Sequence, residues 1–164
     1  MMVERHLKIF MTAGIAILCG FIVVGNIQDP GSNLLFVQHV LSMDTIIPGS
    51  ALANHALPIP ILWRIVFWLI VLGEAATCAL FALGTIELAR ARKEKARDFH
   101  AAKRFVFVGA GCGFLVWFLA FLAVGGEWFA MWQSQFWNGQ QAAFRIVATI
   151  LLVLIFVAQP EAEL

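Results

Sequence analysis

Charged side chains are scarce in this chain. They make up 13% of its residues, whereas 62% of the residues are hydrophobic. Soluble globular domains carry about 25% charged residues, so the composition excludes the ordinary soluble class. A chain of 164 residues is long enough for one compact domain. We therefore expect a single domain that is embedded in a membrane.

Cysteine and histidine are few, and their positions exclude several chemistries. Cys19, Cys78 and Cys112 each lie inside a different long apolar run, so no disulfide between loops is available. We interpret the three thiols as small apolar core residues. No apolar run contains a histidine, which argues against a haem held by two histidines within a helix bundle.

The motifs of common enzyme classes are also missing. The chain has no nucleophile elbow, no P-loop and no dinucleotide-binding glycine pattern. The string "GAGCG" lies inside an apolar run, where Gly109 and Gly113 predict close helix packing. The donors His39, Asp44 and His55 match no metal-binding spacing. We predict no catalytic residue, no cofactor and no metal; an enzyme with a lipid-facing active site under the first outer loop is a third alternative, behind a non-enzymatic subunit and a transporter.

Four apolar runs match the length of about 17–25 residues that a helix needs to cross a bilayer. Residues 9–28 and 105–126 contain no charge, and residues 60–88 and 138–158 contain few. The sequence therefore predicts an all-α, polytopic membrane protein with four transmembrane helices and short interfacial helices in its outer loops. The expected spans are roughly residues 8–28, 60–87, 104–125 and 139–158.

Positive charge is concentrated between the second and third spans. The string "ELARARKEKARDFHAAKR" carries seven Lys or Arg residues, and Arg5 and Lys8 add two more. Because basic loops stay in the cytoplasm, we expect this basic loop, residues 88–103, and both termini to be cytoplasmic. We interpret the charges as a topology signal at solvated helix ends and predict no nucleic-acid partner; binding of anionic lipid is an alternative.

The two halves of the chain resemble each other. "LWRIVFWLIVL" in the second span aligns with "AFRIVATILLVL" in the fourth, which pairs Arg64 with Arg145. This pattern predicts a parallel two-fold repeat of helix, outer loop and helix. Each arginine then lies about one turn inside its span, where it either snorkels to the headgroups or hydrogen-bonds an outer loop.

The first outer loop, residues 29–59, contains an amphipathic stretch too short to cross a bilayer. Gln38, Ser42 and Thr45 recur at helical spacing within residues 33–47, and apolar residues cover most of the remaining surface. We predict a helix over 33–47 that ends at the following Pro-Gly pair. It should lie in the outer interface or over the bundle as a lid.

The polar residues of the outer loops have two interpretations. Gln38, His39 and Asp44 are polar either because this segment meets water or because they face a ligand or a partner subunit. The tryptophans of the second outer loop, "EWFAMWQSQFWN", fit an aromatic belt at the membrane boundary. Asn138, at the start of the fourth span, is a further candidate polar site.

The same loops carry a resemblance to a known family. The strings "NIQDPGSNLLFVQHVLSMDTIIPGS" and "MWQSQFWNGQQAAFR", with "WR" and a span holding a central glutamate between them, resemble bacterial predicted small integral membrane proteins of unknown function. The resemblance covers nearly the whole chain. It implies four spans and a bacterial inner membrane, and it implies no activity.

Glu74 lies near the centre of the second span. A carboxylate exposed to lipid there costs at least about 2.5 kcal/mol, so the side chain should face the bundle. Arg64 is ten residues away, roughly 15 Å along a helix, which excludes an ion pair between the two. We expect a protonated carboxyl that donates a hydrogen bond to Thr12, Thr77, Thr149 or a backbone carbonyl.

Two functions from different classes fit these features. The first is a non-enzymatic subunit or interaction partner of a larger membrane complex, with the lid and the tryptophan-rich loop as a docking surface. The second is a small transporter or channel, a homo-oligomer with Glu74 on its polar path. We favour the first, because one intramembrane acid with few other polar groups makes a poor conduit for a hydrophilic solute.

Overall fold

The computed structural model describes residues 2–161. The first, second and fourth spans are single helices, whereas the third span, Ala96–Trp128, contains a turn at residues 102–103. The elements of the spans are α1 (Met2–Gln28), α3 (Pro60–Ala91), α4 (Ala96–Ala101), α5 (Arg104–Gly113), the π-helical η2 (Phe114–Trp128) and α6 (Gln140–Ala158). The predicted all-α fold with four membrane-spanning helices is confirmed.

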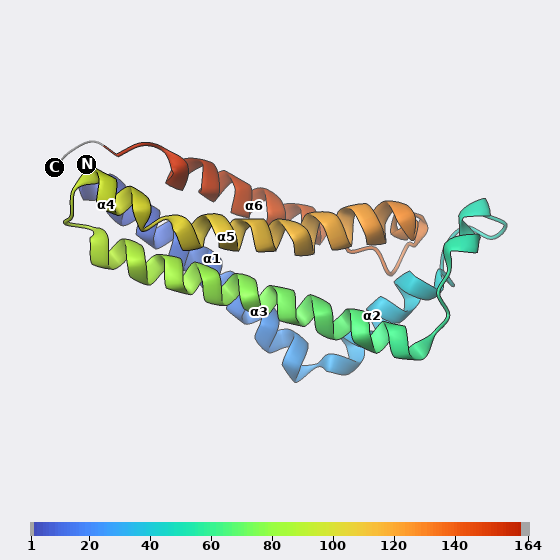
Figure 1. Ribbon diagram of the computed structural model, residues 1–164. Coiled ribbons are helices and arrows are strands. Elements are labelled where there is room, and N and C mark those ends of the chain that lie inside the picture. The colour runs from blue at the N-terminus through green and yellow to red at the C-terminus, as the bar shows by residue number, and fades with distance from the viewer. Residues whose placement is uncertain (1, 162–164) are drawn as a thin grey trace.

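The spans run along one long axis, with both termini and the α3–α4 turn at the same end (Figure 1). We call this end the terminal end and the opposite one the loop end. Helices α1 and α3 pack together, α3 packs on α5, and α6 packs on η2 and returns to α1. Consecutive spans are therefore neighbours, as short connections favour.

The helices extend further into the basic segment than the sequence predicts. Helix α3 continues to Ala91, and α4 begins at Ala96, so the expected loop 88–103 is largely helical. Its Ala, Arg, Lys and Glu residues are all strong helix formers. Helix α1 likewise begins at Met2 rather than near residue 8.

The amphipathic helix of the first loop, α2 (Pro30–Ser42), is shorter and begins earlier than predicted. The Asp29 side chain caps it by accepting a hydrogen bond from the Ser32 N–H at 3.2 Å. The helix ends because Met43 adopts the left-handed conformation, with φ at 53°, and donates its N–H to the His39 carbonyl. Burial of the Met43 side chain holds this conformation in place, so the chain turns before the Pro-Gly pair.

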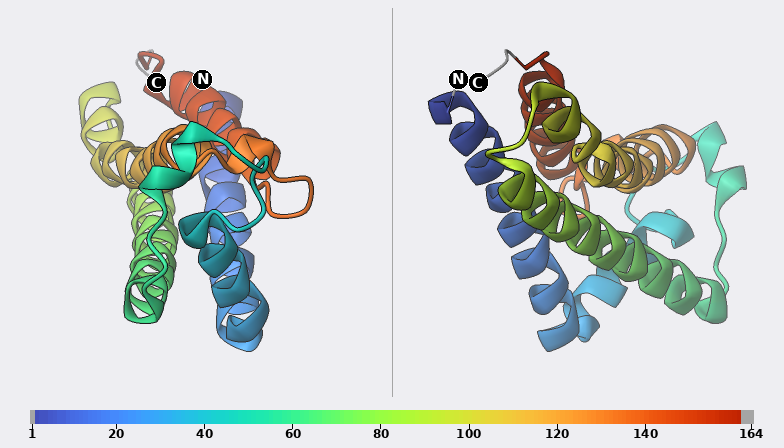
Figure 2. Two further views of the ribbon diagram at one scale, coloured as in Figure 1. Left: turned by 90° about the vertical axis from the view of Figure 1, so that its right-hand side faces the viewer. Right: turned by 60° about the vertical axis from the view of Figure 1, so that its left-hand side comes forward.

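Helix α2 covers the loop end of the bundle. Helices α1 and α3 lie close together at the terminal end and diverge toward the loop end, where α2 packs on α3 (Figure 2). Val37 and Leu41 of α2 are buried in one apolar cluster with Phe67 and Val71 of α3. Two short 3₁₀ turns, η1 (Ala51–His55) and η3 (Met131–Gln133), complete the loop end. The segment thus lies over the bundle, which is the lid alternative.

The predicted glycine face of the third span packs closely against its neighbours. A Cβ atom at Gly113 would lie 2.9 Å from Ile150 of α6, and one at Gly109 would lie 3.1 Å from Phe81 of α3. These glycines allow three helices to approach around a core that is closed at its centre. Cys19 is buried in the same core.

Candidate functional site

A partly open cavity of about 250 Å³ lies beneath α2. Helices α1, α2, α3, η2 and α6 all contribute to its wall. Most of the lining is apolar, and its polar groups are Asn26, Asn33 and Glu74. A few polar groups in an apolar concave site are typical of places where proteins bind something specific.

Glu74 is buried at the floor of this cavity. Its side chain is 3% exposed, as the cost of placing a carboxyl in lipid predicts. Its hydrogen-bond partner is one that sequence reasoning missed: the Asn26 Nδ2 donates to Glu74 Oε2 at 2.5 Å. Thr12, Thr77 and Thr149 were the predicted hydrogen-bond partners of Glu74. Their hydroxyls each donate instead to the carbonyl four residues earlier in their own helix.

The meeting of Asn26 and Glu74 follows from where α1 ends. Asn26 lies in the last turn of α1, whereas Glu74 lies near the middle of α3. Helix α1 therefore stops about halfway along α3, and α2 covers the remainder. As a result the carboxyl faces a cavity rather than a sealed core. Its second oxygen, Oε1, makes no hydrogen bond within residues 2–161.

A second cavity, of about 310 Å³ and almost wholly apolar, lies along α2. Phe36 of α2 and Phe121 of η2 line both cavities, and their rings stack with centroids 6.2 Å apart. Val40 of α2, Val66 of α3 and Val124 of η2 belong to the apolar cavity alone. Helix α2 thus forms a wall of both cavities, of which only the first contains polar side chains.

The polar residues of the two long loops bind these loops to each other and contact the start of α6. His39 Nδ1 lies 2.8 Å from Asp44 Oδ1, and the His39 ring stacks on Trp137 at 4.4 Å. Asn138, which precedes the N-cap residue Gly139, accepts a hydrogen bond from the Gln140 N–H at 3.1 Å beside the start of α6. These contacts give His39, Asp44 and Asn138 a structural task at the loop end.

The three possible metal ligands of the first outer loop, His39, Asp44 and His55, do not come together. His55 stacks on Trp128 with ring centroids 4.1 Å apart, and its Nδ1 donates to the Trp128 carbonyl at 2.9 Å. Among residues 2–161, no three His, Cys, Asp or Glu side chains gather as they would to hold a metal ion. Gln38 is half-buried, and its side chain has no hydrogen-bond partner in that part of the chain.

Arg64 and Arg145 are both exposed, in the second turns of α3 and α6. Within the described residues neither guanidinium makes a hydrogen bond or an ion pair, so the alternative of hydrogen bonds to an outer loop is not seen there. Arg64 is instead flanked by the exposed apolar side chains of Ile61, Ile65 and Trp68. This environment supports the snorkelling alternative; the two-fold repeat stays a prediction.

A second group of residues missed from the sequence lies at the terminal end. Arg5, Lys8 and Lys103 are buried there around the carboxylate of Glu161. The sequence suggested solvated topology signals, because basic residues beside a span are ordinarily exposed. The α3–α4 turn, Phe99 and the return of the chain after α6 all enclose these cations, and no local pattern predicts these tertiary contacts.

Comparison with known families matches residues 4–160 to the family described as "Predicted small integral membrane protein (DUF2165)". The chain belongs to this family. The resemblance seen in the loop strings is therefore confirmed, and this family member is an integral membrane protein with four apolar helices. The family description assigns no activity. No match was found among curated proteins or among solved structures.

Proposed function

We propose that this family member is a non-enzymatic subunit or interaction partner of a larger complex in a bacterial inner membrane, with its terminal end in the cytoplasm. The observation that carries the proposal is Glu74 Oε1, an uncommitted oxygen of a buried carboxyl that faces an open, mostly apolar cavity. Oε1 opens on the cavity and is not sealed among protein atoms, so a molecule in the cavity can reach it. A second molecule that supplies the missing hydrogen bond therefore gains affinity there.

The occupant that fits best is a lysine or arginine side chain from a transmembrane segment of the partner. Such a side chain has an apolar stem and a donor at its tip, which matches an apolar cavity with a carboxyl at its floor. The cavity of about 250 Å³ is smaller than the roughly 300–1,000 Å³ of typical small-molecule sites. One side chain suits this volume better than a whole solute.

The alternative is a small transporter or channel that uses Glu74. Its polar path would have to continue from the cavity toward the terminal end. That part of the bundle is filled by the buried apolar side chains of Ile15, Phe81, Ile150 and Val153. The packing therefore favours a docking role for Glu74 over a conducting one.

Photo-crosslinking with mass spectrometry tests the proposal. A photoreactive phenylalanine analogue at Phe36, which lines the cavity, should crosslink in cells to one membrane protein, next to a Lys or Arg of that protein. Glu74→Gln keeps the size of the side chain but cannot ionise beside a partner's cation, so it should reduce this crosslink at least about tenfold, a loss of about 1.4 kcal/mol. The matched control is Glu87→Gln, an acid on the terminal half of the same helix that pairs with Arg90 on the surface.

Two outcomes would reject the docking role. An undiminished crosslink in the Glu74→Gln variant would mean that the partner does not contact this carboxyl. A crosslink only to a second copy of the same chain would favour the homo-oligomeric transporter. Flux of a solute through reconstituted vesicles, lost on Glu74→Gln, would then establish that alternative.

A further inference from the structure

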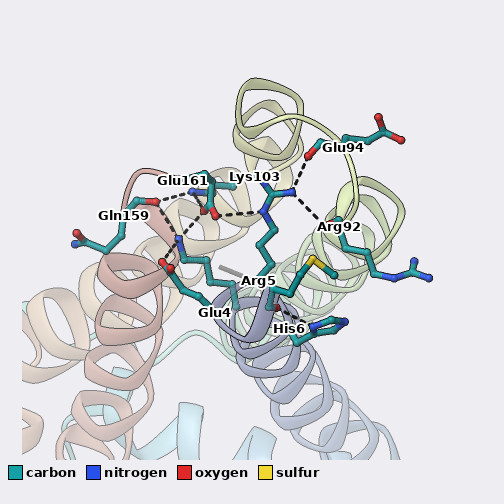
Figure 3. Close-up of polar contacts among 10 residues, drawn as sticks. Glu4, Arg5, His6, Arg92, Glu94, Lys103, Gln159 and Glu161 are labelled. Carbon is teal, nitrogen blue, oxygen red and sulfur yellow. Dashed lines mark hydrogen bonds and ion pairs between the residues drawn. The ribbon is translucent and has the colours of Figure 1, made fainter. Parts of the chain in front are cut away.

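Three cations and one carboxylate are buried together at the terminal end (Figure 3). Arg5 and Lys8 come from α1, Lys103 directly precedes α5, and Glu161 follows α6. Their side chains are 1%, 0%, 0% and 3% exposed, respectively. Segments that are far apart in the chain therefore converge on one desolvated, charged site.

The single carboxylate is shared by all three cations. Lys8 Nζ and Lys103 Nζ lie 2.6 and 2.8 Å from Glu161 Oε1. Both ammonium groups also donate to the Gln159 carbonyl, at 3.0 and 2.8 Å. Arg5 Nε lies 3.6 Å from Glu161 Oε2. Two ammonium groups thus use the same acceptors while a guanidinium stands beside them.

The cluster has more donors and more positive charge than its present partners satisfy. Arg5 Nη1 donates to the carbonyls of Arg92 and Glu94 at 3.1 and 2.7 Å. Arg5 Nη2 is buried and has no hydrogen-bond partner within the described part of the chain. The other nearby acid, Glu4, lies 3.1 Å from Lys8 but is 40% exposed at the rim. Three buried positive charges therefore face one buried negative charge.

Glu161 is ionised in this setting. Burial alone would raise its pKa, but the hydrogen bonds and charges of Lys103 and Lys8 outweigh burial and hold the pKa below its usual value. The carboxylate therefore behaves as an anionic ligand of the cluster. It is carried on a tail outside the helices, because α6 ends at Ala158.

We propose that the cluster of Arg5, Lys8 and Lys103 is a binding site for a phosphate-type anion, and that Glu161 is its exchangeable intramolecular occupant. A phosphate group carries up to two negative charges and three acceptor oxygens. It can satisfy the arginine fork and both ammonium groups, which one carboxylate cannot. Displacement of the tail after Ala158 leaves every helix intact.

The shared chemistry has two sources, a free phosphate and the headgroup of an anionic lipid at the membrane surface. Binding of inorganic phosphate to the full-length protein in a neutral detergent tests the first source. Nanodiscs of phosphatidylcholine with and without phosphatidic acid, whose headgroup is a phosphate monoester, test the second. A response to inorganic phosphate assigns the free ion, whereas a response to phosphatidic acid alone assigns the lipid headgroup.

Substitutions separate a built site from general charge attraction. Glu161→Gln removes the competing occupant, so the affinity for the anion should rise at least about tenfold, because less of the site is blocked. Lys103→Gln should abolish saturable binding. Lys93→Gln makes the same change of charge on the exposed α3–α4 turn and should bind as the wild type does.

Three results would overturn the proposal. The first is equal binding by the wild type and Glu161→Gln. The second is equal loss in Lys93→Gln and Lys103→Gln, which indicates unspecific attraction. The third result applies if the Glu161→Gln variant fails to fold without the anion. Added phosphate or phosphatidic acid should restore its thermal transition, and failure of both to do so contradicts an exchangeable site.

Discussion

At the scale of single residues, loss of the hydrogen bond between Asn26 and Glu74 affects the two side chains differently, because their burial differs. Asn26 is half-buried near the cavity, whereas Glu74 is almost fully buried. Asn26→Ala leaves Glu74 Oε2 without its donor, so we expect it to lower the free energy of unfolding by about 1–3 kcal/mol. Reversible unfolding in detergent measures this change.

Thr149 provides the control for this prediction. Its side chain is exposed and bonds only to its own helix, so Thr149→Ala should change stability by less than about 0.5 kcal/mol. Equal losses in the two variants would mean that the Asn26 hydrogen bond adds nothing specific. Glu74→Gln should melt close to the wild type, because glutamine retains an acceptor for Asn26.

The ion cluster predicts a pH dependence. The pKa of Glu161 is lowered from 4.5 in the folded protein, so the folded state binds the proton more weakly than the unfolded state does. The stabilisation is then fully present above about pH 4.5 and is lost as the pH falls through the lowered folded pKa. Between pH 6 and pH 3.5, Glu161→Gln should lose less stability than the wild type. Parallel thermal melts test this, and identical slopes would contradict it.

Burial of Glu74 could be predicted from the sequence, because the cost of placing a carboxyl in lipid decides its direction. Its partner could not be predicted, since Asn26 lies 48 positions away and its relevance depends on where α1 ends. The burial of Lys8 and Lys103 could not be predicted from the sequence either. It depends on a tail whose path is set by tertiary contacts rather than by a local pattern.

At the scale of elements, the position of α2 over the bundle can be tested along its length. Spin labels along residues 30–47 should show water accessibility with a period near 3.6 residues from Pro30 to Ser42, with protection at Val37 and Leu41. The periodicity should stop after Met43. A uniformly mobile and water-exposed profile would show that α2 does not pack on α3.

Close packing of α3 on α5 depends on the absence of a side chain at Gly84. A Cβ there would lie 2.7 Å from Val106 Cγ2 and 3.1 Å from the Val106 backbone nitrogen. Gly84→Ala should therefore cost about 1–3 kcal/mol through overpacking. Gly111 has nothing within 4 Å of its Cβ position, so Gly111→Ala should be neutral or stabilise by up to about 1 kcal/mol. Equal melting of both variants would refute the close approach.

Element limits follow from the sequence where one local signal dominates. The Asp-Pro turn marks the start of α2, and the charge-free runs mark the spans. The end of α2 was predicted too late, because the buried Met43 imposes a left-handed turn for which methionine has no intrinsic preference. Residues 88–103 were predicted to be a loop because their positive charge was interpreted as a topology signal, whereas their high helix propensity was not considered.

At the scale of the whole molecule, the shared location of both termini and the α3–α4 turn allows a topology test. A reporter enzyme fused after Lys93 should be active on the cytoplasmic side, because basic segments stay there. The same reporter inserted after Gly49, exposed at the loop end, should be active on the opposite side. Activity after Lys93 on the outer face alone would reverse the proposed orientation.

The order of residues along the chain gives the ion cluster a consequence during biosynthesis. Arg5 and Lys8 are translated first and Lys103 later, but Glu161 emerges only after α6. Until then the first three helices hold three cations without their carboxylate. A nascent chain that stops before the fourth helix lacks Glu161, so we expect its terminal end to stay incomplete until the last helix and the residues after it have been made.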